Sequence, residues 1–443
     1  MTLERLFACG TIVVSLLIRS PRAHIGLVLL VIGVFMGGQA SAQSSAEWIQ
    51  FRGPTQQGIA SSVKLPTEWG PETNITWRKE LPGVGWSSPV TADGRIYLTT
   101  AVPLGEGRKA DQSLRTVCLD ADSGDVVWDV EVFQQDGETA PKIHTKNSHA
   151  SATPILEGPF VYVHFGHMGT ACLRKQDGSI VWGKQELAYK PTHGNGGSPV
   201  LFGDNLIFSI DANEKQAVIA LHKATGDIVW QTPRNVPDLP KYFAFCTPLL
   251  IEVNGQTQLI SQGSGAVMSL DPHNGQEIWR VTYGDGYSVV PRPIFANGLV
   301  YVCTGYDRSS LIAMRPDGHG DVTETHVEFI LDRNVPYNPS PVAVDDAVYM
   351  ISDNGILSCV DGITGDVRWK NRIGGNFSAS LLTANGLIYM LDEAGKSTIV
   401  RHADEYEEVA QNDLAERALA SFGIHNDAIL LRTEKALYRI ENK

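Results

Sequence analysis

The sequence predicts an all-β fold, an eight-bladed β-propeller of four-stranded antiparallel blades whose ring is closed by an N-terminal strand completing the last blade. Three observations predict it. A Gly-x-x-x-Trp segment recurs through Trp128, Trp182, Trp230 and Trp279 at spacings of 54, 48 and 49 residues. A short Pro-led strand precedes each segment, and 43 Gly among 443 residues supply the turns. Sheets of this size bury both faces only when neighbouring sheets stack on them, which gives a ring.

Residues 1–42 have the order of a secretory signal peptide. Arg19 and Arg22 precede an apolar run over residues 25–38, and the small residues Ala40 and Ala42 follow it. We expect cleavage near Ala42 and a periplasmic or secreted bacterial protein. The run is shorter than the ~20 residues of a spanning helix, so no transmembrane span is expected in the mature chain. Retention of the segment as an anchor is the alternative. Residues 43–74 follow as an N-terminal lead-in.

Each repeat is interpreted as four short strands. Prolines begin the innermost strands at Pro89, Pro154, Pro199, Pro248, Pro293 and Pro341, with Leu381 at the next equivalent position. The Gly before each Trp suits a turn with positive φ. Six tryptophans occupy one slot on the outermost strand and are expected to pack between blades: Trp77, Trp128, Trp182, Trp230, Trp279 and Trp369. In the fifth unit, Glu324 after Gly320 is predicted to hold this slot.

Ring closure sets the blade count at eight, over residues 75–443. The last repeat has only three strands in the C-terminal residues 418–443, and the segment 75–81, which contains Trp77, supplies the fourth. Sharing a blade between both ends removes two free sheet edges. Residues 403–420 are charged and Ala-rich, which predicts either a degenerate outer strand or a short helical turn in the seventh unit.

Charge and cysteine usage exclude several classes of function. The chain carries 36 Lys and Arg against 49 Asp and Glu, a net charge of -13, and no basic cluster, so nucleic acid is not an expected partner. Cys118, Cys172 and Cys359 fall where parallel segments have Ala220, Ser269 and Ala313. This equivalence indicates a small buried slot rather than a disulfide framework.

The segment CLDADSGDVVW resembles the pyrroloquinoline quinone (PQQ)-type propeller repeat, and the resemblance covers residues 77–443. The lead-in WIQFRGPTQQGIA and the following LPGVGWSSPV are similar to secreted bacterial proteins with this repeat, planctomycete ones especially. The family includes quinoprotein alcohol dehydrogenases and a noncatalytic scaffold lipoprotein of outer-membrane β-barrel assembly. The repeat therefore implies the fold and leaves the function open.

The resemblance does not carry over the dehydrogenase chemistry. Those enzymes typically have a vicinal Cys-Cys disulfide, an Asp base and Ca²⁺ held by Glu, Asn and Asp, and no residues here match that set. The chain also lacks a serine-hydrolase elbow, an HExxH zinc motif and a phosphate-binding loop. We expect no catalytic residue, no metal and no cofactor, with PQQ and calcium as the alternative.

Residues just before the innermost strands should gather at one mouth of the channel. Aromatic and His side chains dominate this set and could stack on sugars or peptide groups, or else simply plug the channel. His144, His149 and His193 offer a metal site as a further alternative. The predicted ligand-binding mouth consists of Trp86, His149, His193, Phe243, Tyr287, Tyr337 and Phe377.

The leading functional hypothesis is an exported, noncatalytic propeller that serves as an interaction scaffold in the periplasm or cell envelope. Its expected partner is an envelope protein or a small ligand, and a monomer is expected. A diverged PQQ-dependent oxidoreductase and a glycan- or peptide-binding propeller are the alternatives.

Overall fold

A computed structural model describes residues 47–443, apart from 62, 108, 188, 237 and 285, and a separate pair of two-residue strands, β1 (Phe7–Ala8) and β2 (Thr11–Ile12). The predicted signal peptide and its cleavage near Ala42 otherwise lie outside the described residues. Among the described residues, no helix has the length and apolar character needed to cross a membrane.

Residues 45–443 form one unit, and its strands build eight antiparallel sheets, the blades. Blade 1 consists of β5 (Val90–Ala92), β6 (Arg95–Pro103), β7 (Gln112–Asp120) and β8 (Val126–Gln135), and blade 2 of β9 (Ile155–Glu157), β10 (Phe160–His164), β11 (Thr170–Arg174) and β12 (Ile180–Lys184). Blade 3 consists of β13 (Val200–Phe202), β14 (Asn205–Asp211), β15 (Gln216–His222) and β16 (Ile228–Pro233), and blade 4 of β17 (Leu249–Val253), β18 (Gln256–Gln262), β19 (Ala266–Leu270) and β20 (Glu277–Thr282).

Blade 5 consists of β21 (Ile294–Ala296), β22 (Leu299–Cys303), β23 (Leu311–Met314) and β25 (Val327–Leu331), and blade 6 of β26 (Val342–Val344), β27 (Ala347–Ile351), β28 (Ile356–Asp361) and β29 (Val367–Arg372). Blade 7 consists of β30 (Leu382–Ala384), β31 (Leu387–Leu391), β32 (Lys396–Arg401) and β33 (Glu408–Asp413), and blade 8 of β34 (Gly423–His425), β35 (Ala428–Arg432), β36 (Ala436–Ile440) and β4 (Ile75–Glu80). The only helical pieces among the described residues are η1 (Gly166–Met168) and α1 (Thr323–His326).

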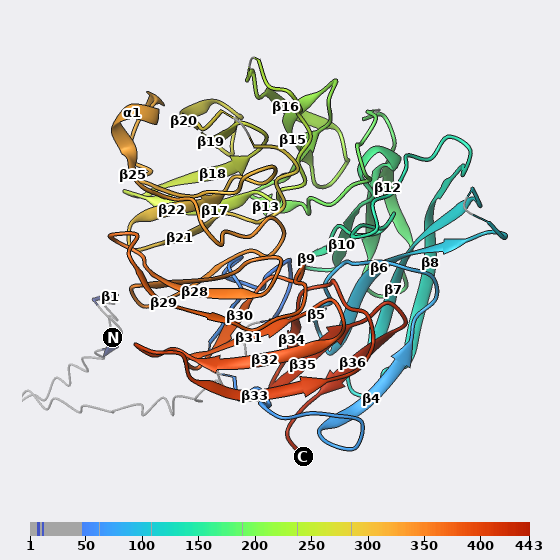
Figure 1. The fold of residues 1–443 in the computed structure, drawn as a ribbon. Coiled ribbons are helices and arrows are strands. Elements are labelled where there is room, and N and C mark those ends of the chain that lie inside the picture. The colour runs from blue at the N-terminus through green and yellow to red at the C-terminus, as the bar shows by residue number, and fades with distance from the viewer. Residues whose placement is uncertain are drawn as a thin grey trace, which may run out of the picture. The chain divides into compact units, whose positions relative to one another are not determined.

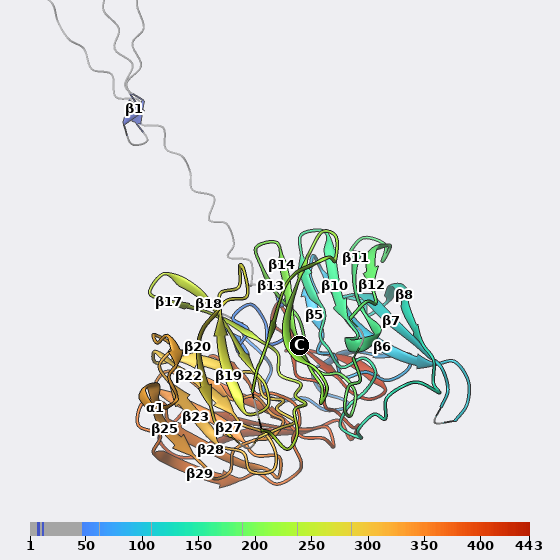
Figure 2. The same cartoon turned by 90° about the horizontal axis from the view of Figure 1, so that it is seen from above.

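The blades follow one another in chain order around a common centre (Figure 1). Seen from above, the cyan strands of blade 1 and the orange strands of the later blades lie on opposite sides of the ring (Figure 2). The hydrophobic clusters combine residues of neighbouring sheets, such as Leu119 of blade 1 with Leu437 of blade 8. The core therefore lies between blades, as the propeller prediction requires.

Every blade has a β-bulge at the same place, where the outermost strand passes the slot. In blade 1 the register shifts between Cys118 and Leu119, so that Trp128 lies opposite Cys118. The equivalent pairs are Cys172 with Trp182, Ala220 with Trp230, Ser269 with Trp279, and Cys359 with Trp369. The predicted small slot is confirmed, and the five cysteines that the structure describes are buried and free.

The glycine before each tryptophan serves two purposes. Gly226 has φ +77°, and a Cβ added to it would lie 2.6 Å from Cε3 of Trp182 in the preceding blade. Trp182 in turn donates from Nε1 to the carbonyl oxygen of Lys223 at 2.9 Å. The turn therefore needs glycine both for its backbone conformation and for the close approach of the neighbouring indole.

The prediction for the fifth unit was wrong. Phe329, not Glu324, lies opposite Ala313 in the slot, and Glu324 is exposed on α1. The chain between β23 and β25 first forms β24 (Gly320–Asp321), which pairs in parallel with β20 of blade 4. This excursion moves the slot along the chain by five residues. In the seventh unit, the degenerate outer strand is confirmed as β33, with Ala410 in the slot.

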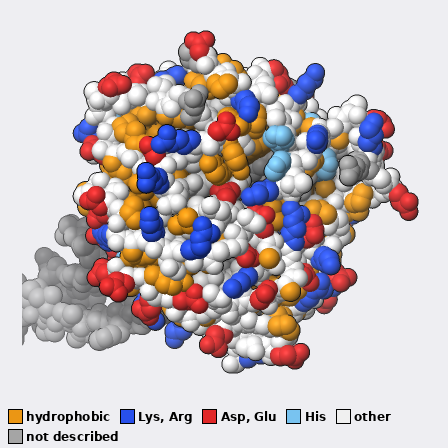
Figure 3. All heavy atoms as spheres, viewed as in Figure 1, with side chains coloured by type: hydrophobic (Ala, Val, Ile, Leu, Met, Phe, Trp, Pro, Cys, Tyr) orange, Lys and Arg blue, Asp and Glu red, His pale blue; other side chains and the backbone are white. Residues whose placement is uncertain are grey.

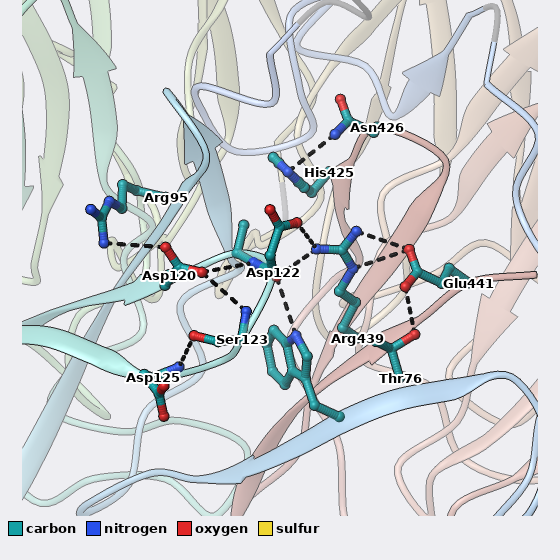
Figure 4. A network of polar contacts seen from close by, with 12 residues as sticks. Thr76, Arg95, Asp120, Asp122, Ser123, Asp125, His425, Asn426, Arg439 and Glu441 are labelled. Atoms are coloured by element: carbon teal, nitrogen blue, oxygen red, sulfur yellow. Dashed lines mark hydrogen bonds and ion pairs between the residues drawn. The ribbon is translucent and has the colours of Figure 1, made fainter. Parts of the chain in front are cut away.

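The predicted closure is confirmed, because β4 pairs with β36 and completes blade 8. Trp77 lies opposite Arg439, and both donate to the carbonyl oxygen of Ala121 in blade 1, at 3.2 and 2.6 Å. Arg439 also pairs with Asp122 at 2.7 Å and Glu441 at 2.9 Å (Figure 4). The seam between the two ends of the chain thus combines indole packing with an ion-pair network.

Candidate functional site

Residues 48–60, here called the N-terminal plug, cover one end of the central channel. Each innermost strand starts near the mouth of the channel and runs away from it. In blade 1, Trp86 lies at the mouth, Ser88 follows it, and Thr91 of β5 lies farthest from the mouth. The plug bonds to the ends of these strands that lie away from the mouth. It contacts blades 1, 2, 4, 5 and 7 through Trp48 with Thr91, Ile49 with Leu156, Gln56 with Leu250, Gln57 with Phe295, and β3 (Ile59–Ala60) with β30.

Two buried arginines fasten the plug. Arg292 donates to the carbonyl oxygen of Phe51 at 2.7 Å and to Oε1 of Gln56 at 2.7 Å. Arg52 is 2% exposed and donates to the carbonyl oxygen of Pro341 at 2.6 Å. Burial lowers the pKa of each arginine to about 9. Backbone and amide oxygens therefore hold both guanidinium groups.

A ring of buried hydroxyl groups, the hydroxyl belt, surrounds the channel above the plug. Its members stand just before the first strand of seven blades: Ser88, Thr153, Ser198, Thr247, Ser340, Ser380 and Ser421. Five of the seven donate their backbone N–H to the hydroxyl of the next blade: Ser88 to Thr153, Thr153 to Ser198, Ser198 to Thr247, Ser340 to Ser380, and Ser380 to Ser421, at 2.9 to 3.2 Å. Arg292 replaces the hydroxyl in blade 5, where its N–H donates to Ser340 at 2.9 Å.

Six rings form an aromatic arc at the mouth: His144, His193, Phe243, Tyr287, Tyr306 and Tyr337. Their centroids are spaced 4.3 to 6.3 Å apart, and Tyr306 stacks on Tyr337 with an interplanar angle of 18°. Burial, followed by the nearby His144, lowers the pKa of His193 below its usual range. Figure 3 shows histidine and hydrophobic side chains next to one another near the centre of the face in view.

The loop between β8 and β9, residues 136–154, crosses the mouth and is here called the strap. Lys146, on this strap, pairs with Glu393 of blade 7 at 2.9 Å and reaches Asp353 of blade 6 at 3.6 Å. Burial opposes the charge of Lys146, but its hydrogen bond to Glu393 and the charge of Asp353 outweigh this effect and raise the pKa of Lys146. The strap is also bonded to the arc, because Asn147 Nδ2 donates to the carbonyl oxygen of His193 at 2.9 Å.

Between strap, arc, belt and plug lies a cavity of about 320 Å³. Phe51 of the plug and all seven belt residues line it, together with Lys146 and the arc residues other than Tyr337. Trp86 also lines it, is 6% exposed, and has an indole Nε1 without a hydrogen-bond partner. The guanidinium of Arg417 lies 5.2 Å from the centroid of this indole.

The structure brings together four of the seven residues proposed for the mouth. Trp86, His193, Phe243 and Tyr287 line the cavity. Tyr337 stacks on Tyr306 outside the lining. Phe377 is buried in the core between blades 6 and 7.

His149 lies apart, close enough to His167 to add to the effect of burial, which lowers the pKa of His167 to about 4. The described residues contain no group of three or more His, Cys, Asp or Glu side chains placed to hold a metal ion. The structure therefore does not bring His144, His149 and His193 together as one group of ligands.

Sequence reasoning missed the belt, the strap and the plug. The belt had a visible signal, because Ser or Thr precedes the proline in SSPV, ATPI, GSPV and CTPL. Phe51 and Lys146 had none, since each reaches the cavity only through contacts with distant blades.

The sequence matches a family described as "Outer membrane protein assembly factor BamB" over residues 67–198, 115–371 and 331–405. The plug lies before the first matched residue. The BamB of Moranella endobia (strain PCIT) is 23% identical over 299 residues, covering 64% of this chain and 72% of the relative. That of Yersinia pestis is 24% identical over 228 residues, covering 49% of this chain and 54% of the relative, so the chain spans about half of that relative.

Solved structures show the same fold. BamB from Moraxella catarrhalis has a TM-score of 0.58 at 14% identity, covering 83% of this chain and 97% of that one. A quinohemoprotein alcohol dehydrogenase from Comamonas testosteroni has a TM-score of 0.51 at 11% identity, covering 91% and 82%. A europium-containing methanol dehydrogenase has a TM-score of 0.53 at 11% identity, covering 89% and 91%. Scaffold and enzyme thus share the architecture, and the fold alone does not separate them.

Proposed function

Because the chain belongs to the family of outer membrane protein assembly factor BamB, we propose that it is a noncatalytic scaffold of the bacterial envelope, which docks partner proteins of outer membrane protein assembly. The relatives' name supports the process, and the surface described next supports a docking role. Export through the signal peptide of residues 1–42 is part of the proposal.

The observation that carries the proposal is an exposed apolar stripe on three consecutive blades. The first two residues of β8, β12 and β16 are all β-branched and 40 to 49% exposed: Val126, Val127, Ile180, Val181, Ile228 and Val229. The bulge explains why both residues of each pair face outward, since it leaves one residue of each pair out of the ladder. Repeated apolar pairs on a surface are typical of protein interaction sites.

In the part of the chain that the structure describes, no further strand pairs with the outer edge of β8, β12 or β16. In blade 4 the equivalent edge is occupied, because β24 adds itself to β20, and Trp279 is fully buried there. The protein therefore already contains one case of strand addition at an outer edge. An extended segment of a partner could extend β8, β12 or β16 in the same way, with the valine and isoleucine pairs providing apolar contact.

Quinone chemistry is not part of the proposal, because the cavity residues do not fit PQQ with calcium. PQQ carries carboxylates and needs a calcium ion beside it, yet the described residues that line the cavity include no Asp or Glu. The single lysine in the lining is already paired with Glu393 and Asp353. The donor set therefore suits neither the metal nor the anionic cofactor.

The test is affinity capture from the envelope fraction of the native host, with mass spectrometry of the captured proteins. The variant Val126→Asp, Ile180→Asp, Ile228→Asp places a charge on each stripe pair, while Val367→Asp changes the same strand position in blade 6. We expect outer membrane assembly proteins to be enriched by the wild type and by Val367→Asp, and lost with the triple variant. Equal capture by the triple variant, or no enrichment of assembly proteins, would contradict the proposal.

A further inference from the structure

The cavity between strap and plug has the features of a built binding site that is independent of the outer stripe. It is closed at one end by Phe51, and its wall contains one buried donor, Nε1 of Trp86, that has no hydrogen-bond partner among the described residues. A buried N–H left without an acceptor is destabilising, and a ligand oxygen would satisfy it. The volume of about 320 Å³ is at the lower end for small-molecule sites.

Lys146, the one Lys, Arg, Asp or Glu side chain among the described residues that line the cavity, is already paired within the protein. Lys146 is held by Glu393 and Asp353. Burial alone would raise the pKa of Glu393, but the hydrogen bond that Ser378 donates and the contact with Lys146 outweigh burial and lower this pKa. Arg417 pairs with Glu434 at 3.0 Å and covers the indole of Trp86. A charged ligand would have to break these pairs or lie beside them uncompensated, so the cavity favours a neutral one.

The hydroxyl belt favours a ligand with many hydroxyl groups over an extended peptide. Backbone N–H groups of Ser88, Thr153 and Ser198 are consumed by the belt, and so are those of blades 5 to 7. A peptide strand would therefore find six of the eight backbone N–H groups at these positions already used. Each belt hydroxyl that accepts an N–H keeps its own proton to donate, except that of Ser380, which donates to Ser340.

We propose that this cavity binds a neutral saccharide of mono- or disaccharide size, with pyranose faces against the aromatic arc and sugar hydroxyls against the belt and Nε1 of Trp86. Aromatic rings beside many hydroxyl groups match the two faces of a sugar, one apolar and one polar. The plug lies outside the residues matched to the family, so the closed end of the site is built by this chain's own N-terminal segment. The site adds a ligand to the proposed scaffold and does not depend on its docking stripe.

The experiment is isothermal titration of the purified protein with maltose, cellobiose and N,N′-diacetylchitobiose, each up to about 10 mM, which covers millimolar Kd values. Trp86→Phe keeps an aromatic ring but removes the N–H donor, and we expect binding about three- to tenfold weaker. Trp230→Phe is the matched control, because its Nε1 is also buried without a partner but lies in the packing slot of blade 3. Tyr287→Ala should weaken binding to a similar extent at another point of the wall.

The supporting result is saturable binding of at least one of these sugars, weakened by Trp86→Phe and Tyr287→Ala and unchanged in Trp230→Phe, with all melting temperatures similar. No binding of any of the three sugars overturns the proposal. An equal loss of binding in Trp230→Phe overturns it as well. Failure here leaves the capture experiment on the outer stripe unaffected, so the two proposals fail separately.

Discussion

Arg439 of blade 8 and Asp122 of blade 1 form an ion pair of 2.7 Å across the seam where the ring closes. The same guanidinium holds Glu441, which Thr76 of the closing strand also bonds at 2.6 Å. Burial would raise the pKa of Glu441, but the hydrogen bonds from Thr76 and Arg439 outweigh it and lower the pKa. The network ties three segments of the chain together at one point (Figure 4).

The seam should respond to acid. A carboxyl group with a lowered folded pKa contributes stability above its ordinary pKa, near 4.5 for Glu441, and loses that contribution as the pH falls through the lowered value. Arg439→Met removes the partner, so we expect a less stable protein at neutral pH and a smaller further loss below about pH 4.5. Urea unfolding across this range measures both. Arg401→Met, at an ion pair whose side chains are half exposed, should change neither by much, and identical acid profiles for Arg439→Met and wild type would count against the network.

Glycines at the blade interfaces should differ from glycines in open turns. Gly226 and Gly386 have φ +77° and +73°, but only the Cβ of an alanine at 226 would meet an indole, that of Trp182. Both Gly→Ala variants lose about 1 kcal/mol from the backbone conformation. Gly226→Ala should lose roughly 1–3 kcal/mol more through overpacking. Equal unfolding midpoints in urea would refute the interface role of Gly226.

The slot in blade 5 belongs to Phe329. Its ring lies 6.3 Å from that of Tyr301 and against Gly365 of the next blade. Phe329→Ala should therefore cost about 2–3 kcal/mol of unfolding free energy. Glu324→Ala, on the exposed helix, should stay within about 0.5 kcal/mol of the wild type. If urea unfolding shows a larger loss of stability for Glu324→Ala than for Phe329→Ala, the sequence-based assignment of Glu324 to the slot would be supported instead.

The plug should open locally when its anchor is removed. Arg292→Met deletes the bonds to Phe51, Gln56 and Pro248, so residues 48–60 should exchange amide hydrogens at least about tenfold faster, while β14 keeps its protection. Hydrogen exchange with mass spectrometry resolves the two regions. Arg308→Met, at a side chain 78% exposed, serves as the control, and an unchanged plug in Arg292→Met would show that other contacts hold it.

The sequence predicted those parts of the molecule that repeat. Positions equivalent to Trp182 and Gly226 recur with the same local geometry from blade to blade. The repeat in the sequence therefore predicts the sheet, the slot and the closing strand. Glu324 was assigned wrongly because β24 leaves the repeat to pair with blade 4, and a period cannot show such a detour.

The site was predicted only in part, because its remaining members act over long distances in the chain. Phe51 meets Arg292 across 241 residues, and Lys146, in the loop between blades 1 and 2, pairs with Glu393 of blade 7. Neither contact has a local pattern. The position of Trp86, His193, Phe243 and Tyr287 at the cavity followed instead from the start of each innermost strand, where the repeat itself fixes the direction of the chain.

The position of β4 also sets an order in time. Its partner β36 belongs to the C-terminal part of the chain, so β4 is the first blade strand to be made and the last to be paired, and the ring stays open at one edge until β36 is made. Any factor that holds the emerging chain unfolded must therefore shield β4 until blade 8 is complete. A truncation that removes β36 would accordingly release both ends of the ring at once instead of trimming one strand.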